Sequence, residues 1–434
     1  MNIGRKHMDA LSRKGFDRNY WAMALEGSSF MGGIAVISTG GAVALFINAM
    51  TGSKTLIGLA VTVQSLFVIV GQLCSAPYVR SIRRLPEFLF NSMAIQRVAP
   101  LLMSLPLLLG FAGNWSVGIF LILFGFFWFM DGFLTIAWAE LCTRALKPEL
   151  RGHMMGMQVT IGGAASLLTG LLLTWLLATP ALSNNHRFAM VFILAGIVLL
   201  SSLFFIRLVR DPNPIVNPEK LDVRQYYMRI PSVIRRSKPL QHMLAARIPS
   251  YIGFASVSFI VVYGAGVLSL SETQVSWLIY ANIVGGLIGG ISLGEISRRF
   301  GNKTIILICN TGVYIALGMA VLLTFLPVLG YAWLFATCTL ASLTANNWLG
   351  YFSYILDIAP SEERSVYQVI SNFVGIPFSF SGYVMGAVID RFGFIAMFVI
   401  SGIFAAAAIV LSIRLLSKRQ IQDDMSLVNG CPIE

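Results

Sequence analysis

Residues 187–209 read RFAMVFILAGIVLLSSLFFIRLV, a stretch of 23 residues in which Arg187 and Arg207 carry the only charges. A helix that crosses the hydrocarbon core of a bilayer needs about 20 consecutive, mostly apolar residues. The stretch meets that requirement. Its apolar residues are also continuous rather than alternating, which excludes a strand of a membrane β-barrel. It therefore predicts a membrane-spanning helix, and the fold depends on how many such stretches the chain contains.

Eleven further stretches of this kind bring the expected number of spanning helices to twelve. Charged residues make up only 12% of the 434 residues, about half of their share in soluble proteins, and 56% are apolar. This composition excludes a disordered chain, and five cysteines are too few for a disulfide-stapled secreted domain. The expected spans are 20–48, 55–79, 87–111, 115–140, 153–178, 187–209, 240–268, 273–297, 302–326, 330–357, 364–389 and 393–416.

Basic residues are concentrated on one side of the expected membrane. The terminal segments and the even-numbered loops hold 26 of the 31 Lys and Arg residues, whereas the opposite side holds only Lys54, Arg187 and Arg391. Cytoplasmic loops are enriched in Lys and Arg, so both termini are expected in the cytoplasm. The expected location is the inner membrane of a bacterium. Topology also explains the net charge of +12, which therefore does not indicate nucleic-acid binding.

The chain consists of two similar halves. The widest polar gap divides the spans into six and six, and equivalent residues recur at an offset near 217. Glu140 and Asp357 end the fourth helix of each half, and Arg151 and Arg364 open the fifth. Repetition of this kind indicates a duplicated six-helix unit. The expected domains are an N-terminal bundle over 1–209, a central cytoplasmic linker over 210–239 and a C-terminal bundle with a short tail over 240–434.

Twelve spans, a six-plus-six duplication, a long central linker and basic loops after the second helix of each half resemble the major facilitator superfamily. The loop signature of that superfamily is Gly-x-x-x-Asp-(Arg/Lys)-x-Gly-(Arg/Lys)-(Arg/Lys). The second copy here, GEISRRFGNK from Gly294 to Lys303, has Arg298 where Asp is expected. The start of the chain, from Asn19-Tyr20-Trp21 onward, is similar to a bacterial permease subgroup. The resemblance implies two bundles that rock about a solute site near the membrane midplane, driven by a proton or solute gradient.

Asp131 is the most deeply placed charge in the expected membrane. It ends the run FGFFWFMD, about 15 Å from the cytoplasmic end of its helix, and Arg97 in the preceding helix lies at a similar depth. An ionisable side chain at this depth is costly and requires a reason. Two interpretations stay open. Asp131 carries protons or contacts the solute in the central cavity, or it neutralises Arg97 in a structural ion pair.

Glu26 and Arg247 occupy equivalent places in the first helix of each half, 221 residues apart. In the superfamily that the chain resembles, these two helices face the cavity. The resemblance therefore implies a latch between opposite charges on the cytoplasmic side. The alternative is that each side chain extends to the membrane surface without contact to the other.

Charges at the cytoplasmic ends of helices form a second group of gating candidates. Asp357-x6-Arg364 is similar to a loop motif of sugar-transporting members of the superfamily. Ion pairs within the group would hold the cytoplasmic gate closed, whereas the alternative is surface charge that follows the positive-inside rule. The candidates are Glu140, Arg151, Asp357, Arg364, Arg80, Arg298 and Arg299.

Uncharged polar residues are the candidates for contact with a solute. Asn346 and Asn347 suit hydrogen bonds to a hydroxylated or zwitterionic solute, and Trp348 suits stacking on an apolar or sugar face. Gln64 and Gln158 are further candidates. Polar residues in membrane helices also join helices to one another, and this alternative applies to each of the five.

Glycines are concentrated in some of the expected helices. The stretch 273–297 contains Gly285, Gly286, Gly289, Gly290 and Gly294, a spacing that permits close approach of two helices. The resemblance implies that the second, fifth, eighth and eleventh spans pack between the halves, where smooth faces would let the bundles rock. Plain close packing or dimerisation is the alternative.

These features predict a secondary active transporter rather than an enzyme. The sequence has no phosphate-binding GxxxxGK[S/T] loop, no paired-histidine metal pattern and no catalytic constellation. Proton coupling through Asp131 is expected, and a polar, sugar-like nutrient is slightly favoured over an exported drug as the solute. The alternative is a non-transporting sensor or assembly partner with the same fold. We expect a monomer that contacts a small-molecule solute and membrane lipid, without nucleic acid, metal or cofactor.

Overall fold

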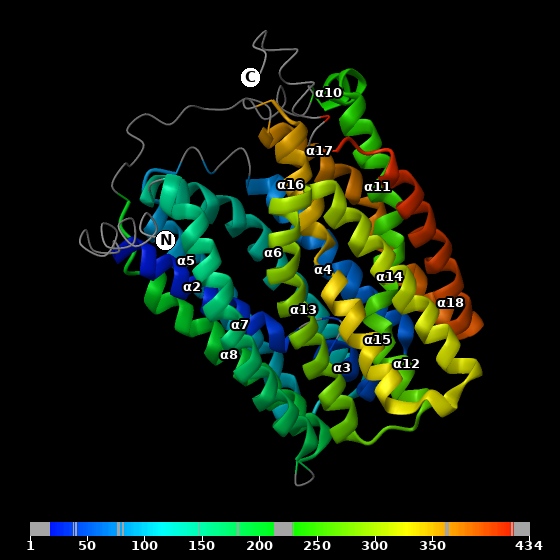
Figure 1. The fold of residues 1–434 in the computed structure, drawn as a ribbon. Coiled ribbons are helices and arrows are strands. Elements are labelled where there is room, and N and C mark those ends of the chain that lie inside the picture. The colour runs from blue at the N-terminus through cyan, green and yellow to red at the C-terminus, as the bar shows by residue number, and fades with distance from the viewer. Residues whose placement is uncertain are drawn as a thin grey trace, which may run out of the picture.

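The computed structural model describes residues 18–417 apart from 38, 40, 76–78, 80–81, 147, 180–181, 212–227, 229 and 361–363, and in addition Gln420. These residues fold into α-helices joined by short turns and 3-10 segments (Figure 1). The elements are α2 (Arg18–Val36), α3 (Ala42–Thr51), α4 (Lys54–Ser75), α5 (Leu85–Leu108), α6 (Gly113–Ala145), α7 (Pro148–Ala178), α8 (Asn184–Ile206), α10 (Ile230–Arg236), α11 (Lys238–Ala255), η2 (Ser256–Phe259), α12 (Ile260–Val267), α13 (Glu272–Phe300), α14 (Asn302–Phe325), η3 (Pro327–Leu329), α15 (Gly330–Thr344), α16 (Asn347–Ile358), α17 (Arg364–Gly375), η4 (Pro377–Phe380) and α18 (Ser381–Ile413).

The described helices account for all twelve expected spans. Ten segments are long and apolar enough to cross a membrane, and α3 is a shorter apolar helix. The segment Val366–Ile413 contains two expected spans, because Gly393, with φ 82° and ψ 173°, interrupts the helix. Glycine adopts such a positive φ at no steric cost. Together, α2 and α3 cover the first expected span, 20–48. The all-α fold predicted from the sequence is confirmed.

Four of the spans, each expected as one apolar stretch, are interrupted. The first breaks between α2 and α3, and the seventh passes through the 3-10 segment η2. The tenth breaks at Ala345–Asn346, and the eleventh at η4, which begins with Pro377. Proline has no N–H to continue the helical hydrogen bonds, which explains the last break. Broken helices in transporters supply unpaired backbone groups close to solute and ion sites.

The helices form two sets that meet along two seams. The N-terminal set comprises α2 to α8, and the C-terminal set comprises α10 to α18. Between the sets, α4 packs on α17, η4 and α18, and α7 packs on α13. These elements belong to the second, eleventh, fifth and eighth spans. The most extensive contacts between the sets therefore come from the four spans that the resemblance placed there, and α3 of the first span also contacts α12 of the seventh.

The two ends of the molecule are packed differently. We call the end with α10 and α17 the near end and the end with α3 and α12 the far end (Figure 1). At the far end one apolar core includes residues of both sets, among them Phe46 and Phe192 from the N-terminal set and Phe259 and Phe398 from the C-terminal set. At the near end each set has a core of its own. The sets therefore share a core at the far end. At the near end their cores are separate, and the sets meet where Leu73 of α4 packs on the C-terminal core and Asn372 on α17 donates to Gln72 on α4 at 2.6 Å.

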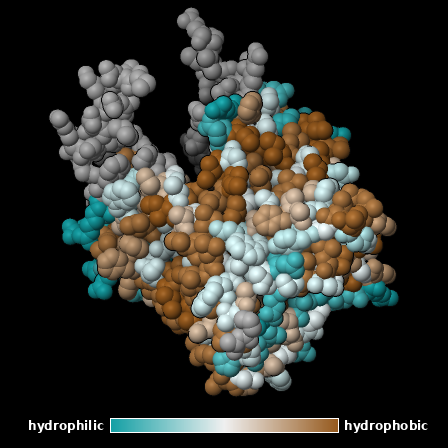
Figure 2. Space-filling view, turned by 60° about the horizontal axis from the view of Figure 1, so that its bottom comes forward, coloured by the Kyte–Doolittle hydropathy of each residue, from teal (hydrophilic) through white to brown (hydrophobic). Residues whose placement is uncertain are grey.

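Large apolar side chains cover much of the outside of the molecule. Trp115 is 79% exposed, Ile122 74% and Val328 89%. Figure 2, in which the far end is turned toward the viewer, shows hydrophobic residues over much of the visible surface. Soluble monomers rarely expose apolar surface of this extent. The outer surface is that of a multi-pass integral membrane protein, with its helices facing lipid.

The seam between α4 and α18 depends on glycine. A Cβ added to Gly58 on α4 would overlap the carbonyl oxygen of Gly382 on α18. Because a backbone oxygen cannot move aside as a flexible side chain can, Gly58→Ala is expected to lower the free energy of unfolding by about 1–3 kcal/mol. The measurement is thermal or denaturant unfolding of the purified protein. Gly290→Ala on α13 is the matched control, because nothing lies within 4 Å of its added Cβ. Equal stability of the two variants would contradict tight packing at this seam.

Candidate functional site

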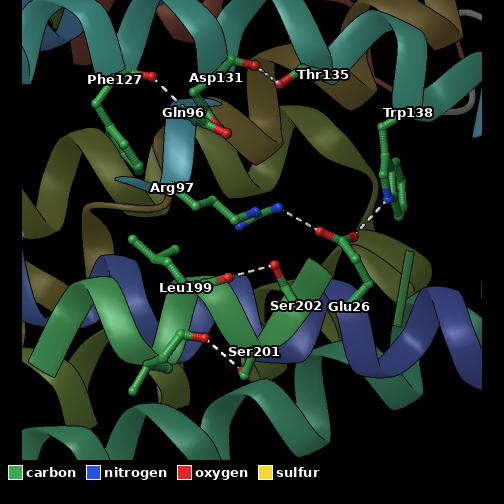
Figure 3. Close-up of polar contacts among 11 residues, drawn as sticks. Glu26, Gln96, Arg97, Phe127, Asp131, Thr135, Trp138, Leu199, Ser201 and Ser202 are labelled. Atoms are coloured by element: carbon green, nitrogen blue, oxygen red, sulfur yellow. Dashed lines mark hydrogen bonds and ion pairs between the residues drawn. The ribbon is translucent and has the colours of Figure 1, made fainter. Parts of the chain in front are cut away.

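A buried cluster of charged residues lies between α2, α5 and α6 in the N-terminal set (Figure 3). The guanidinium of Arg97 donates to Oε1 of Glu26 at 2.7 Å, and the indole Nε1 of Trp138 donates to Oε2 of Glu26 at 2.9 Å. Glu26 and Arg97 are each only 2% exposed. Both carboxylate oxygens of Glu26 therefore have a hydrogen-bond donor, and the pair is an ion pair in a water-poor environment.

Asp131 lies beside this ion pair, on α6 (Figure 3). It precedes Trp138 by seven residues, about two helical turns, so the two side chains project from one face of α6. The Asp131 side chain is half-buried, contacts Gln96 and interacts electrostatically with Arg97. Gln96 also donates from Nε2 to the carbonyl oxygen of Phe127 at 3.2 Å. This bond to the α6 backbone holds the amide of Gln96 beside the carboxylate of Asp131.

The structure gives Arg97 a different ion-pair partner from the one that the sequence suggested. The expected partner was Asp131, but the ion pair forms with Glu26, and Asp131 is a second carboxylate close to the same guanidinium. Two further nitrogens of Arg97, Nε and Nη1, are buried without a hydrogen-bond partner in the part of the chain that the structure describes. The ring of Phe30 lies 5.1 Å from the guanidinium carbon. One positive charge therefore faces two carboxylates, an arrangement that can accept a proton on the second.

Arg247 lies on α11 in the C-terminal set and bonds within that set. Its Nε donates to the hydroxyl of Tyr251 at 3.1 Å, and its Nη1 donates to Ser371. The rings of Tyr251 and Tyr351 lie 5.3 and 5.4 Å from its guanidinium carbon. The suggested latch between Glu26 and Arg247 is not formed in this structure, because Glu26 is buried against Arg97. The burial of Glu26 also contradicts the alternative that its side chain extends to the membrane surface.

The two amides of the tenth span connect helices in this structure. Asn346 donates from Nδ2 to the carbonyl oxygen of Gly286 on α13 at 3.0 Å, and Asn347 donates to Ser250 on α11 at 3.3 Å. These contacts are the interhelical role that was the alternative to solute binding. Trp348 differs, because its side chain is 62% exposed. Of these three candidates, Trp348 is the one whose side chain is exposed.

The two glutamine candidates also bond between helices. Gln64 on α4 accepts a hydrogen bond from Thr39, in the break between α2 and α3, at 2.8 Å. Gln158 on α7 lies against Gly27 of α2, and its backbone carbonyl accepts from Ser28 at 3.1 Å. Gln64 therefore fixes the interruption of the first span, and Gln158 packs α7 on α2.

The gating candidates of the N-terminal set belong to a small network at the near end. Glu140 accepts from Nε of Arg144, one turn further along α6, at 2.9 Å. Arg144 also pairs with Asp211, beyond the end of α8, at 3.5 Å. The network connects the end of α6 with the chain after α8. Arg80 and the side chain of Arg151 lie outside the described residues.

The gating candidates of the C-terminal set likewise bond within their own set. Asn302 at the start of α14 donates to Asp357 on α16 at 2.7 Å. Arg299 pairs with Glu295, one turn earlier on α13. The side chains of Arg298 and Arg364 lie outside the described part of the chain. These contacts of Asp357 and Arg299, like those of Glu140 and Arg144 above, each lie within one set.

Nothing in the sequence pattern singled out Gln96 and Trp138 as members of the charge cluster. A signal was nevertheless available for both. Gln96 is the neighbour of Arg97 in sequence, and Trp138 follows Asp131 at a spacing of seven, which places the two on one helix face. The partner of Glu26 was harder to find, because depth along a helix does not tell which way a side chain points.

Twelve apolar spans in two sets, with a charge cluster buried in one of them, define the fold of a multi-pass membrane protein. Comparison with known proteins supports this class. Residues 243–424 match the family model described as Major Facilitator Superfamily. No curated protein matches the sequence.

Solved transporter structures resemble the chain over nearly its whole length. The xylose transporter XylE from E. coli, in a partially occluded inward open conformation, has 14% identity and a TM-score of 0.68, covering 93% of this chain and 98% of that chain. A bacterial homologue of the iron transporter ferroportin, in an inward-facing state, has 15% identity and a TM-score of 0.63, with coverages of 92% and 99%. The nucleoside transporter NupG has 10% identity and a TM-score of 0.66, with coverages of 91% and 98%.

The chain has the fold of these transporters, and its residues 243–424 match the Major Facilitator Superfamily model. The resemblance inferred from the spans and the duplication is thus confirmed.

Proposed function

We propose that the protein is a secondary active transporter that moves a small polar solute by alternating access and couples this movement to a proton gradient. The observation that carries the proposal is the cluster in which Arg97 faces both Glu26 and Asp131. Three ionisable groups in the interior of a membrane protein are costly, and buried ion pairs add little to stability. Such a cluster is therefore expected where the protein uses a change in the net charge of the cluster, as proton coupling does.

Asp131 is the member of the cluster that we expect to carry the proton. Both oxygens of Glu26 accept hydrogen bonds from Arg97 and Trp138, so a proton on Glu26 would disrupt one of them. Asp131 is half-buried and lies outside that ion pair. With Asp131 protonated the cluster is neutral, and with Asp131 ionised it carries one negative charge. The two forms favour different surroundings, which provides a way to couple the proton to a movement of the sets.

The proposal extends to the way in which the protein lies and moves in the membrane. We expect the bundles 1–209 and 240–434 to rock against each other, connected by the linker 210–239. The near end would lie in the cytoplasm of a bacterium, since the basic residues are concentrated there. The separate near-end cores support an inward-facing state in that orientation. The protein would act in the inner membrane as a monomer surrounded by lipid, without nucleic acid.

A polar, sugar-like nutrient is slightly favoured as the solute over an exported drug. The exposed ring of Trp348 supports this choice, because aromatic rings stack on sugar faces. Two of the similar structures are named as transporters of xylose and of nucleosides, which both contain a sugar. The competing function is a membrane sensor or assembly partner that has the same fold and moves no solute.

Solute uptake into proteoliposomes tests the proposal. Purified protein is reconstituted with an imposed pH gradient and offered radiolabelled sugars, amino acids, nucleosides and cationic dyes in turn. We expect one polar class to accumulate against its gradient and this accumulation to disappear when a protonophore collapses the pH gradient. Binding of a solute, seen as a raised unfolding temperature, without flux of that solute would favour the sensor instead.

A further inference from the structure

A carboxylate of the C-terminal set caps a helix of the N-terminal set at the far end. Asp390, on α18 just before the Gly393 turn, accepts hydrogen bonds from the backbone N–H of Lys54 at 3.0 Å and of Thr55 at 2.8 Å. It also accepts from the hydroxyl of Thr55 at 2.5 Å and of Ser53 at 3.4 Å. The first N–H groups of a helix have no partner within it, and negative charge is favoured beside them. Asp390 supplies both the acceptor and the charge to α4.

Helix α4 also has a cap of its own, so the contact with Asp390 is an addition to it. The hydroxyl of Ser53, directly before the helix, accepts from the backbone N–H of Leu56 at 3.2 Å. Asp390 binds the two N–H groups that Ser53 leaves free, those of Lys54 and Thr55. The beginning of α4 is therefore satisfied in full only while the two sets are together at the far end.

The seam continues from Asp390 toward the near end. The backbone N–H of Tyr383 on α18 donates to the hydroxyl of Thr62 on α4 at 3.0 Å. Gly386, one turn before Asp390, lies so close to α4 that an added Cβ would overlap the carbonyl oxygen of Lys54. Asp390 thus lies at the end of a tight backbone contact rather than on an isolated surface bridge.

A second polar contact joins the sets on the other side of the far end. Arg187, near the start of α8, pairs with Glu272, the first residue of α13, and also donates to the carbonyl oxygen of Thr179 at 3.0 Å. Thr174 on α7 donates to the carbonyl oxygen of Ser276 on α13 at 3.4 Å. Each seam therefore ends in a carboxylate of the C-terminal set bound to a donor of the N-terminal set.

We propose that Asp390 is the latch of the far-end gate: its cap on α4 holds the two sets together there and must be released before the far end can open. The inference rests on the proposed alternating access. Asp390, which was not among the gating candidates from the sequence, would thus hold the gate that is closed in this structure. The gating candidates Glu140, Asp357 and Arg299 lie at the near end, and their contacts named above stay within one set. Asp390 acts by positioning helices and not by contact with the solute.

Hydrogen exchange of the purified protein, without any solute, tests the latch. In Asp390→Ala, the amides of residues 54–57 are expected to exchange about 2- to 30-fold faster, the range that loss of a helix cap gives. If Asp390 were only a helix cap, no other segment would change its exchange rate. A latch predicts in addition faster exchange in residues 273–280, across the far end, and slower exchange in residues 154–162 and 286–294, which would come together at the near end. A change confined to residues 54–57 would overturn the proposal.

Two further variants make the result independent of local damage. Ser183→Ala removes a far-end cap that lies within one set, on the N–H of His186, and should speed exchange only at the start of α8. Glu272→Gln weakens the second polar contact and should give the same reciprocal pattern as Asp390→Ala, so it replaces that variant should Asp390→Ala fail to fold. The assay needs no transport. If the reciprocal pattern appears in a protein that moves no solute, the latch is supported and the transport proposal is refuted. If the protein transports a solute without showing the pattern, the transport proposal is supported and the latch is refuted.

Discussion

The Asp131→Asn variant is expected to lose all accumulation of solute against a gradient while it keeps the exchange of solute across the membrane. Asparagine has nearly the size of aspartate and can keep the contact with Gln96, but it cannot take up or release a proton. Without a second carboxylate, the cluster of Glu26 and Arg97 remains neutral throughout the cycle. The solute then equilibrates until its concentrations on the two sides are equal. The measurement compares uptake driven by a pH gradient with exchange of labelled solute in the same proteoliposomes.

The matched control for this variant is Glu87→Gln. Glu87 is an acidic residue of the same domain, but its side chain is 67% exposed, and it pairs with Arg84 on the surface. The same loss of charge should leave accumulation intact there. Accumulation by Asp131→Asn at the level of the parent protein would refute Asp131 as the proton carrier and would leave it a structural residue.

Arg97→Met is expected to lower the free energy of unfolding by about 3–5 kcal/mol. Methionine fills a similar length, but the substitution leaves the buried carboxylate of Glu26 with Trp138 as its remaining charge-stabilising partner. A buried charge that has lost its counter-ion costs more than the complete pair contributes. The double variant Glu26→Gln with Arg97→Met removes both charges and is therefore expected to regain most of the loss. Denaturant unfolding of the reconstituted protein measures all of these variants.

Arg84→Met provides the reference for loss of an arginine at the surface. The side chain of Arg84 is 80% exposed, so we expect a change within about 0.5 kcal/mol. If Arg97→Met were as stable as Arg84→Met, or if the double variant were less stable than Arg97→Met, the ion pair of Arg97 with Glu26 would not be the interaction that holds the cluster.

The twelve spans could be predicted because one strong physical requirement governs them. Lipid demands long apolar stretches, and these stand out in any window of the sequence. The interruptions within spans could not be predicted equally well. Pro377 indicates the break in the eleventh span, but the break at Ala345–Asn346 has no proline or glycine to announce it. It forms together with tertiary contacts of Asn346 and Asn347, which are absent from a local pattern.

The charge cluster shows what depth alone can and cannot predict. Helix length places Arg97 and Asp131 at similar depth, and the structure does bring them close together. Helix length does not tell which neighbour the long side chain of Arg97 reaches, and this side chain pairs with Glu26 on α2. The contacts of the two amides of the tenth span could not be predicted for the same reason, since the direction of these side chains around the helix depends on how α13, α11 and α16 pack. Asp390 has no distinguishing neighbour in sequence, because its partners lie more than 300 residues away.

The contact of Asp390 with residues 53–55 also forms a composite epitope. One part comes from the start of α4 and the other from α18, and Asp390 is exposed, so a binder can reach the junction. An antibody fragment selected for the two parts together would recognise the molecule only while they are in contact. In the orientation proposed above the far end faces outward, so the fragment applied to spheroplasts would count the molecules whose far-end gate is closed. In structural work it would hold the protein in that one conformation.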